Sequence, residues 1–322
     1  MNNILITSAG RRVSLTRAFQ KELKEVFPDS KVFVSDAAPE LSSAAQIADR
    51  SFNLPLVKDP AYIDVLITLC KKEGIKLIVP TIDPELPVLA ENYEKFVANG
   101  IYPIISSAQF ISYCNDKRNT HHFFATKNIK YAKEYSRTNY TFPFFIKPID
   151  GSGSSDLYII KEESDLSNEL IENEKLLFLE YYSKKEHDEY TCDLYYDRNH
   201  DLKCIVPRKR IEIRGGEVSK GLTRKNILMN YISQRLQHIE GARGCLTFQF
   251  FVHAQTEDVI GIEINARFGG GYPLSYLAGA NYPKWVINEY LLDKPVEPFD
   301  QWKDNLLMLR YDSEVLVEDY HG

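Results

Sequence analysis

Short apolar runs alternate with longer amphipathic stretches through the first hundred residues. The runs predict strands at residues 4–7, 31–35, 77–79 and 101–105, and the stretches between them predict helices that include residues 11–26 and 60–73. Strands that alternate with helices indicate a parallel sheet joined by right-handed crossovers. We therefore predict a Rossmann-like domain over residues 1–110.

After residue 110 the strands follow one another with fewer helices between them. The sequence Asn-Asp-Lys-Arg at 115–118 predicts the start of a helix that reaches Phe124, because Asn and Asp are favourable helix caps. Further strands are predicted at residues 142–147, 157–160, 174–182, 189–196, 204–213 and 305–311, and helices at residues 228–239 and 284–292.

An antiparallel hairpin is predicted over residues 245–271, with its turn at residues 254–258. Successive residues of a strand point to opposite faces, so Glu263, Asn265 and Arg267 share one face. The alternate residues, which suit burial on the opposite face, are Ile262, Ile264 and Ala266.

The polar face of this hairpin gathers oxygen ligands. Gln249 on the first strand can lie across from Glu263 on the second, close to Asn265. Carboxylate and amide oxygens suit Mg²⁺, which takes one or two protein groups and completes its shell with water and phosphate oxygens. Glycines 269–271 follow and leave room beside the metal for a ligand. The alternative is a structural salt bridge between Glu263 and Arg267 at the edge of a hairpin.

A Gly/Ser turn between the strands at 142–147 and 157–160 offers backbone N–H groups that can cradle phosphate oxygens. Lys147, at the end of the entering strand, can place its ammonium group against the same phosphates. The loop residues are Gly151, Ser152, Gly153, Ser154 and Ser155. Taken as a bare pattern, such a turn is usually a flexible connection.

The Lys147 loop and the hairpin together resemble the ATP-grasp superfamily, and in particular a single half of the carbamoyl-phosphate synthase large subunit. The resemblance covers residues 111–290 well and residues 1–110 loosely. It implies an α/β fold in which the Rossmann-like domain precedes two α+β lobes: a small lobe with the phosphate loop over residues 111–182, and a large lobe with the metal-binding hairpin over residues 183–322. The carbamoyl-phosphate synthase relatives use arginine where this chain has Lys147.

The resemblance also implies how ATP is held. The nucleotide-binding residues would be Lys117 and Lys147 at the phosphates, Glu180, Tyr181 and Tyr182 at the adenine, and Glu189 at the ribose. Mg²⁺, or Mn²⁺ in its place, would be held by Gln249, Glu263 and Asn265. The alternatives are a surface lysine at 117 and, for residues 174–182, a buried strand with aromatic packing.

Three arginines, Arg208, Arg210 and Arg214, fall on one face of the strand at 204–213. Most basic runs are solvated faces, but arginines near an anion site suggest recognition of a carboxylate or an acyl phosphate. Arg210 and Arg267 are therefore our candidates for catalysis, and Lys220 is a further candidate.

The first domain has weaker signals. Its first turn, Ser-Ala-Gly-Arg-Arg, lacks the G-x-G-x-x-G fingerprint, so NAD is not expected. Gly10, Arg11 and Arg12 lie at the carboxyl end of the first strand, where they either contact an acceptor substrate or belong to a solvated helix. Asp83 precedes Pro84, and this pair favours a helix N-cap over a role in binding.

Composition narrows the class of protein. Of the 322 residues 44% are hydrophobic and 26% charged, which is typical of a soluble globular chain with two or three domains. The net charge of −6 argues against nucleic acid as the main partner. No apolar run approaches the ~20 residues of a membrane helix. The five cysteines lack C-x-x-C spacing and the histidines are scattered, so we expect neither disulfides nor a zinc site, and a cytoplasmic location.

These observations predict an ATP-dependent carboxylate–amine ligase that forms an acyl phosphate and releases ADP and phosphate. Its partners would be a small-molecule carboxylate and an amine, without nucleic acid or membrane, and a homodimer is compatible with the sequence. Two alternatives stay open. One is chemistry on bicarbonate through carboxyphosphate or carbamoyl phosphate, and the other is an ATP-binding protein without catalysis.

Overall fold

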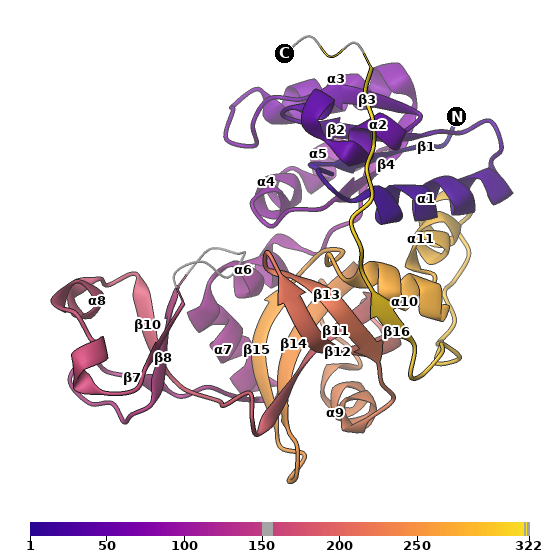
Figure 1. Ribbon diagram of the computed structural model, residues 1–322. Coiled ribbons are helices and arrows are strands. Elements are labelled where there is room, and N and C mark those ends of the chain that lie inside the picture. The colour runs from indigo at the N-terminus through magenta and orange to yellow at the C-terminus, as the bar shows by residue number, and fades with distance from the viewer. Residues whose placement is uncertain (150–156, 319, 321–322) are drawn as a thin grey trace.

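The computed structural model describes residues 1–149, 157–318 and 320. The described strands form three sheets, one in the N-terminal region and two in the rest of the chain (Figure 1). In this view the N-terminal sheet and its helices lie above the largest sheet, and the smallest sheet projects to one side. This mixed α/β architecture confirms the predicted fold class.

The N-terminal sheet is parallel and has the strand order β3-β2-β1-β4-β5. Its strands are β1 (Asn3–Thr7), β2 (Val32–Asp36), β3 (Arg50–Asn53), β4 (Ile75–Pro80) and β5 (Tyr102–Pro103), and its helices are α1 (Val13–Val26), α2 (Ser43–Ile47), α3 (Tyr62–Glu73), α4 (Glu85–Glu91) and α5 (Tyr93–Val97). This order is that of a Rossmann fold without its sixth strand. The sequence pattern missed β3 and α2, which are short.

The central strand β1 shows why the sheet is covered on both faces. Ile4 and Ile6 pack with Phe19 of α1 on one face. Leu5, which points the opposite way, packs with Leu66 of α3 on the other. A parallel sheet buried on both faces needs strands that are apolar throughout, and every residue of β1 is buried.

The smallest sheet is antiparallel, with the strand order β7-β10-β8-β9. It comprises β7 (Glu134–Tyr135), β8 (Phe144–Pro148), β9 (Tyr158–Ile160) and β10 (Leu176–Glu180), with helix α8 (Asn168–Glu172) beside it. Five side chains form its own small core: Phe144, Ile146, Ile160, Leu176 and Phe178. The predicted phosphate loop, Gly151–Ser155, lies outside the described residues.

The largest sheet has the order β16-β13-β12-β11-β14-β15-β6. Its strands are β6 (Lys130–Tyr131), β11 (His187–Tyr196), β12 (Leu202–Arg214), β13 (Glu217–Thr223), β14 (Gly244–His253), β15 (Val259–Asn265) and β16 (Leu307–Leu309). The helices that accompany it are α6 (Ala108–Asn115), α7 (Lys117–Thr126), α9 (Ile227–Leu236), α10 (Tyr272–Ala278) and α11 (Tyr282–Leu291). The strand β6 joins this sheet although it lies within residues 111–182, and the domain boundaries at 110 and 182 remain predictions.

The β14–β15 hairpin has its turn at residues 254–258, where the sequence predicts it. Its register pairs Gln249 with Glu263 and Thr247 with Asn265. The register shifts after Gln249, so Ile262 is an extra residue that breaks the alternation. The expectation that Ile262 is buried with Ile264 is therefore wrong: Ile264 is buried, and Ile262 is partly exposed and lines a cavity.

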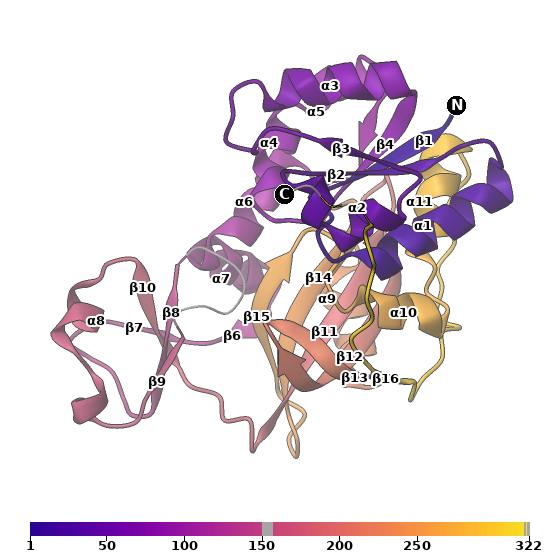
Figure 2. The ribbon, with the colours of Figure 1, turned by 45° about the horizontal axis from the view of Figure 1, so that its top comes forward.

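Two segments run between the parts of the structure. Residues 181–186 lead from β10 in the smallest sheet to β11 in the largest, so they join the two lobes. The segment after β16 runs from the large sheet toward α2 of the N-terminal region in both views (Figures 1 and 2). Among the described residues, no helix has the length and apolar character needed to cross a membrane.

Candidate active site

A cavity of about 1350 Å³ lies where the three sheets face one another. Apart from Lys220, its wall includes every described residue that the sequence singled out for the nucleotide, the metal or catalysis: Lys117, Lys147, Glu180, Tyr181, Tyr182, Glu189, Arg210, Gln249, Glu263, Asn265 and Arg267. These residues span about 150 positions of the chain, and the tertiary fold brings them to one space. Their individual roles remain predictions.

Glu263 is the centre of the polar cluster in this cavity. Its Oε1 accepts hydrogen bonds from Gln249 Nε2 at 2.5 Å and from Asn265 Nδ2 at 3.1 Å. The two amide oxygens face outward to arginines: Gln249 Oε1 accepts from Arg210 at 3.1 Å, and Asn265 Oδ1 accepts from Arg267 at 3.3 Å. The cluster therefore links five side chains in one hydrogen-bonded row.

The donor set of this cluster fits Mg²⁺. It offers the carboxylate of Glu263 and the amide oxygens of Gln249 and Asn265, which are the hard oxygen ligands that Mg²⁺ prefers. Within the described part of the chain, Glu263 Oε2 accepts no hydrogen bond from a protein group. An amide turns its oxygen toward a cation by rotating half a turn, since its nitrogen and oxygen have the same shape.

Lys147 lies on β8 and faces this carboxylate. Its side chain is 7% exposed. Burial lowers the pKa of Lys147 to about 8, with the nearby charge of Lys117 acting in the same direction and Glu263 opposing it. The ammonium form is thus held in an apolar wall by one carboxylate, which makes it ready to accept an additional anion.

The helix α7 brings two groups to the same wall. Asp116 caps it by accepting from the Arg118 N–H, as the Asn-Asp-Lys-Arg sequence predicts, and Lys117 Nζ lies 3.4 Å from Ile149 O. His121 stacks on Tyr131 with ring centroids 4.7 Å apart. Burial, together with the charge of Lys147, lowers the pKa of His121 to about 4, so it is neutral at pH 7. No sequence motif pointed to His121 as a residue of the site.

The end of β10 forms the connection between the lobes. The Glu180 N–H donates to Lys133 O at 2.8 Å, so this N–H is already used within the protein. The Glu180 carboxylate accepts from the Tyr182 hydroxyl at 2.7 Å. Beyond it, Glu189 on β11 forms an ion pair with Arg210, with Oε1 and Nε 3.2 Å apart.

The three arginines of β12 have three different surroundings. Arg208 is 1% exposed and donates twice to the buried Asp193, at 2.7 and 2.9 Å. Arg210 joins the cavity cluster, whereas Arg214 is exposed and pairs with Asp312. On β12 the extra residue Ile211 follows Arg210. It breaks the alternation between Arg210 and Arg214, whereas Arg208 and Arg210 keep the regular register and both line the cavity.

Lys220 lies outside the wall of the cavity. Lys220 lies on β13, and its Nζ is 2.6 Å from Oε2 of Glu212 in an exposed ion pair. Glu212 lies on β12, two residues after Arg210. The alternative of a solvated surface charge therefore describes Lys220 better than a role at the anion site.

The structure overturns the N-cap interpretation of Asp83. Helix α4 begins after Pro84 as its cap residue and has no side-chain cap. Asp83 instead accepts a hydrogen bond from Arg267 Nη2 at 2.5 Å. Arg267 Nε is buried and has no hydrogen-bond partner among the described residues. Arg267 therefore connects the N-terminal region to the Glu263 cluster.

The glycines after the hairpin line the cavity, so the expectation that they leave space for a ligand stays a prediction, and two of them also make room for protein groups. A Cβ atom on Gly270 would lie 2.4 Å from Glu217 Oε1 and 2.5 Å from Arg12 Nη1. A Cβ atom on Gly271 would lie 2.2 Å from Arg208 Nη1. Both glycines are needed because charged side chains approach the backbone closely.

Glu217 joins three parts of the chain at this end of the cavity. Its carboxylate pairs with Arg12 at 3.0 Å and with Arg310 at 2.9 Å, and Arg310 also donates to Gly270 O. Burial acts to raise the pKa of Glu217, but the two arginines outweigh burial and hold it below its usual range. Sequence reasoning missed Glu217, which begins β13, and Arg310, which follows β16, since neither lies in a motif.

Two protein families match the sequence. Residues 4–105 match the family described as PylC-like, N-terminal domain. Residues 172–310 match the family described as ATP-grasp in the biosynthetic pathway with Ter operon. No curated protein matches the chain.

Several solved structures are similar to this chain over nearly its full length. A Rhizobium etli pyruvate carboxylase has a TM-score of 0.70 and 15% identity, and the match covers 95% of this chain but 30% of that one. The biotin carboxylase domain of Hydrogenobacter thermophilus 2-oxoglutarate carboxylase has a TM-score of 0.71 and 13% identity, with coverages of 94% and 73%. An L-amino acid ligase from Bacillus licheniformis has a TM-score of 0.68 and 15% identity, with coverages of 92% and 75%. At these identities the likeness establishes the fold.

Proposed function

We propose that this chain, whose residues 172–310 match an ATP-grasp family, is an ATP-dependent ligase that joins a carboxylate to an amine. The carboxylate oxygen attacks the γ-phosphorus of ATP, and ADP leaves. The amine then attacks the acyl phosphate carbon, loses a proton and displaces phosphate. Such chemistry rests on positioning and charge neutralisation, so it needs no nucleophilic Ser or Cys.

The observation that carries this proposal is the arrangement around Glu263. A buried lysine, one carboxylate and two amides meet in a single cavity, and an arginine lies at each side of them. In this assignment Lys147 and Lys117 bind the phosphate oxygens, and Gln249, Glu263 and Asn265 hold Mg²⁺. The metal, when bound, supplies positive charge that neutralises the triphosphate.

The other residues of the cavity would bind the adenine, the ribose and the acceptor. Glu180, Tyr181 and Tyr182 would bind the adenine and Glu189 the ribose, with Arg210 holding Glu189 in place. Arg267 would bind the acceptor carboxylate or the acyl phosphate, through the N–H that has no partner among the described residues. Asp83, in the N-terminal region, would orient the guanidinium of Arg267 by accepting its hydrogen bond.

An ADP-release screen tests the proposal directly. The protein is incubated with ATP and Mg²⁺ and with carboxylates crossed against amines, each also tested alone. ADP formed only when both partners are present supports the ligase. ADP formed with bicarbonate alone favours the carboxyphosphate alternative, to which the bicarbonate in the carboxylase domain structure lends support. Saturable ATP binding with no ADP from any mixture would favour the non-catalytic alternative. A homodimer stays a prediction.

Lys147 predicts how ATP binding depends on pH. Its pKa of about 8 means that the ammonium is charged below pH 8 and neutral above it. ATP affinity should therefore fall by about tenfold between pH 7 and pH 9, as the charged fraction falls. Isothermal titration of a non-hydrolysable ATP analogue across this range measures the effect.

The control is Lys147→Arg, which keeps the charge across the whole range and should remove the fall above pH 8. Lys147→Met should bind the analogue weakly at every pH. An unchanged pH profile in Lys147→Arg would assign the titration to another group and exclude Lys147 from the phosphate site.

The position of Arg11 leads to a prediction of where the acceptor binds. It is exposed at the wall of the cavity, next to Arg12. Arg11→Ala should raise the KM of the acceptor about tenfold, the size expected for one charged hydrogen bond, and leave the Kd of ATP unchanged. Arg17→Ala removes an exposed arginine from α1, the helix that follows Arg11, and serves as the control. Equal effects of the two substitutions on the acceptor KM would place the acceptor elsewhere.

A further inference from the structure

We propose that His200, His238 and Glu240 form a second metal site, for a divalent cation of the zinc class, on the surface of the large lobe. The residues come from two segments. His200 lies in the turn between β11 and β12, and His238 and Glu240 follow α9. They are not among the residues that line the ATP cavity. The site is therefore separate from the Glu263 cluster.

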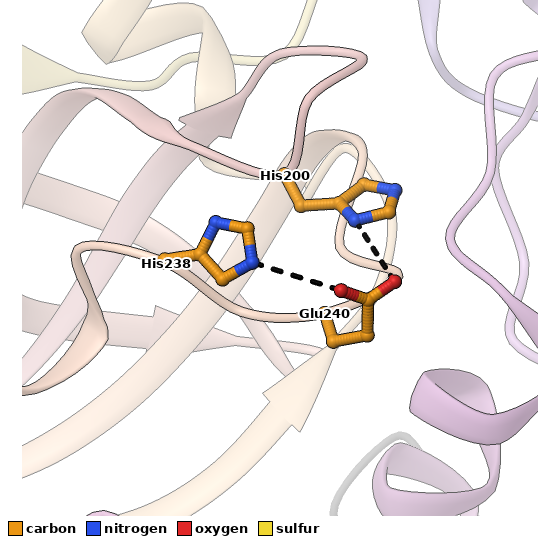
Figure 3. Close-up of side chains that lie close together, drawn as sticks. All are labelled: His200, His238 and Glu240. Carbon is orange, nitrogen blue, oxygen red and sulfur yellow. Dashed lines mark ion pairs between the residues drawn. The ribbon is translucent and has the colours of Figure 1, made fainter.

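The three side chains converge on one another (Figure 3). The Glu240 carboxylate lies between the two rings, with Oε1 3.3 Å from His200 Nδ1 and Oε2 3.7 Å from His238 Nε2. One ligand atom from each residue lies within 4.8 Å of the others. Ligands bind zinc at about 2.0–2.3 Å, so atoms around one ion lie roughly 3–4 Å apart. Rotation of the Glu240 side chain, which is 83% exposed, closes the remaining gap.

Asp201 orients one of the imidazoles. His238 Nδ1 lies 2.9 Å from Asp201 Oδ1. A carboxylate at this nitrogen keeps the ring proton there and leaves the lone pair on Nε2, the nitrogen that faces Glu240. Metal-bound histidines are ordinarily held in this way by a carboxylate or carbonyl on the second nitrogen.

The backbone holds the two segments together without a cation. Ile239 N donates to His200 O at 3.2 Å, and Leu202 N donates to Gln237 O at 2.9 Å. His200 itself has φ of 69°, in the left-handed region that favours glycine. A residue kept in that region is a reason to look for a function at the turn.

The ligand chemistry selects the ion. Two imidazole nitrogens and one carboxylate suit Zn²⁺ and its first-row neighbours, whereas Mg²⁺ prefers oxygen ligands in an octahedron. Three protein ligands leave a fourth position for water. Mg²⁺ supplied for ATP chemistry should therefore not compete at this site.

The side chain of Arg243 acts against the binding of a cation at His200. Both ring nitrogens of His200 face N–H groups, with Gly241 N 3.1 Å from Nδ1 and Arg243 Nε 3.3 Å from Nε2. A neutral imidazole has one lone pair and cannot accept from both. A cation at Nδ1 uses that lone pair and requires a proton on Nε2, so both N–H groups must move away. The positive charge of Arg243 adds repulsion.

A cation here would stabilise the junction with the N-terminal region. Gly241 O accepts from Ser107 N at 2.8 Å, and Arg243 N donates to Ser106 Oγ at 3.2 Å. Residues 106–107 lead out of the N-terminal sheet into α6. A ligand that binds the folded chain and not the unfolded one raises the melting temperature, by an amount that grows with the logarithm of the ratio of ligand concentration to Kd.

Calorimetric titration with Zn²⁺ tests the site. The full chain carries Glu263→Gln, is freed of metal with a chelator, and is titrated in excess Mg²⁺. One equivalent of Zn²⁺ should bind and raise Tm. Glu240→Gln should abolish both effects, and it should fold because Glu240 is exposed. Asp201→Asn should weaken binding by about 10–100-fold, as expected for a group that orients a ligand.

Two more variants make the test specific. Arg243→Ala should tighten Zn²⁺ binding several-fold, because the competing N–H and its charge are removed. His122→Ala removes an exposed histidine from α7 and should change nothing. Absence of saturable Zn²⁺ binding overturns the proposal. Zn²⁺ binding that Glu240→Gln leaves unchanged also overturns it, because the ion is then held elsewhere.

Discussion

Glu263→Gln should reduce substrate-dependent ADP release by on the order of 10²–10³, the usual cost of losing one positioned charge stabiliser. The carboxylate faces Gln249, Asn265 and Lys147, and the substitution removes its charge, which is the anionic member of the proposed metal site. The fold should survive, since a glutamine of the same shape can still accept from the two amides. Steady-state ADP release with the identified substrates measures the loss, and the thermal melting curve checks the fold.

The same substitution makes a second, independent prediction. Burial lowers the pKa of Lys147, and the charge of Glu263 partly opposes that shift. Without Glu263 the pKa of Lys147 should fall further, so the loss of ATP affinity should begin at a lower pH than in the unsubstituted protein. Glu212→Gln, which removes an exposed carboxylate paired with Lys220, is the matched control. Turnover that Glu263→Gln leaves unchanged would exclude this cluster as the metal site.

Arg267→Lys should leave ATP binding nearly intact and reduce turnover by on the order of 10². The guanidinium of Arg267 contacts Asp83 and Asn265 and still has a buried N–H without a partner among the described residues. A lysine has one point charge and cannot reproduce this fork. Comparing the Kd of an ATP analogue with the single-turnover rate separates binding from chemistry.

Asp83→Asn provides the control for Arg267. It keeps the shape of the partner but removes the charge that aims the guanidinium, so it should raise the KM of the acceptor and slow turnover less than Arg267→Lys does. The assignment of Arg267 to the acceptor is wrong if Arg267→Lys weakens ATP binding as strongly as it slows turnover. That outcome would place the guanidinium on the nucleotide.

The sequence predicted those parts of the site that depend on local periodicity and on neighbouring residues in the chain. In the β14–β15 hairpin the period of two puts Glu263 and Asn265 on one face. The pairing of Gln249 with Glu263 also needs the bulge at Ile262, because the register that starts at the turn would otherwise place Gln249 opposite Ile262. The Asp116 cap and the Lys147 strand are equally local. Alternation failed where a bulge inserts one residue, at Ile262 and again after Arg210, because a single extra residue reverses every face beyond it.

The sequence by itself determined the fold class, four of the five strands of the first domain, and the oxygen-rich face of the hairpin. Only the tertiary structure decided which distant groups meet. Asp83 lies 184 positions from Arg267, and Glu217 lies 205 positions from Arg12, so no periodic pattern connects them. Local periods determine the face on which a side chain lies, whereas the partner on that face depends on how whole elements pack. The close contacts of Gly270 and the pairing of charges across the cavity therefore became visible only in the folded chain.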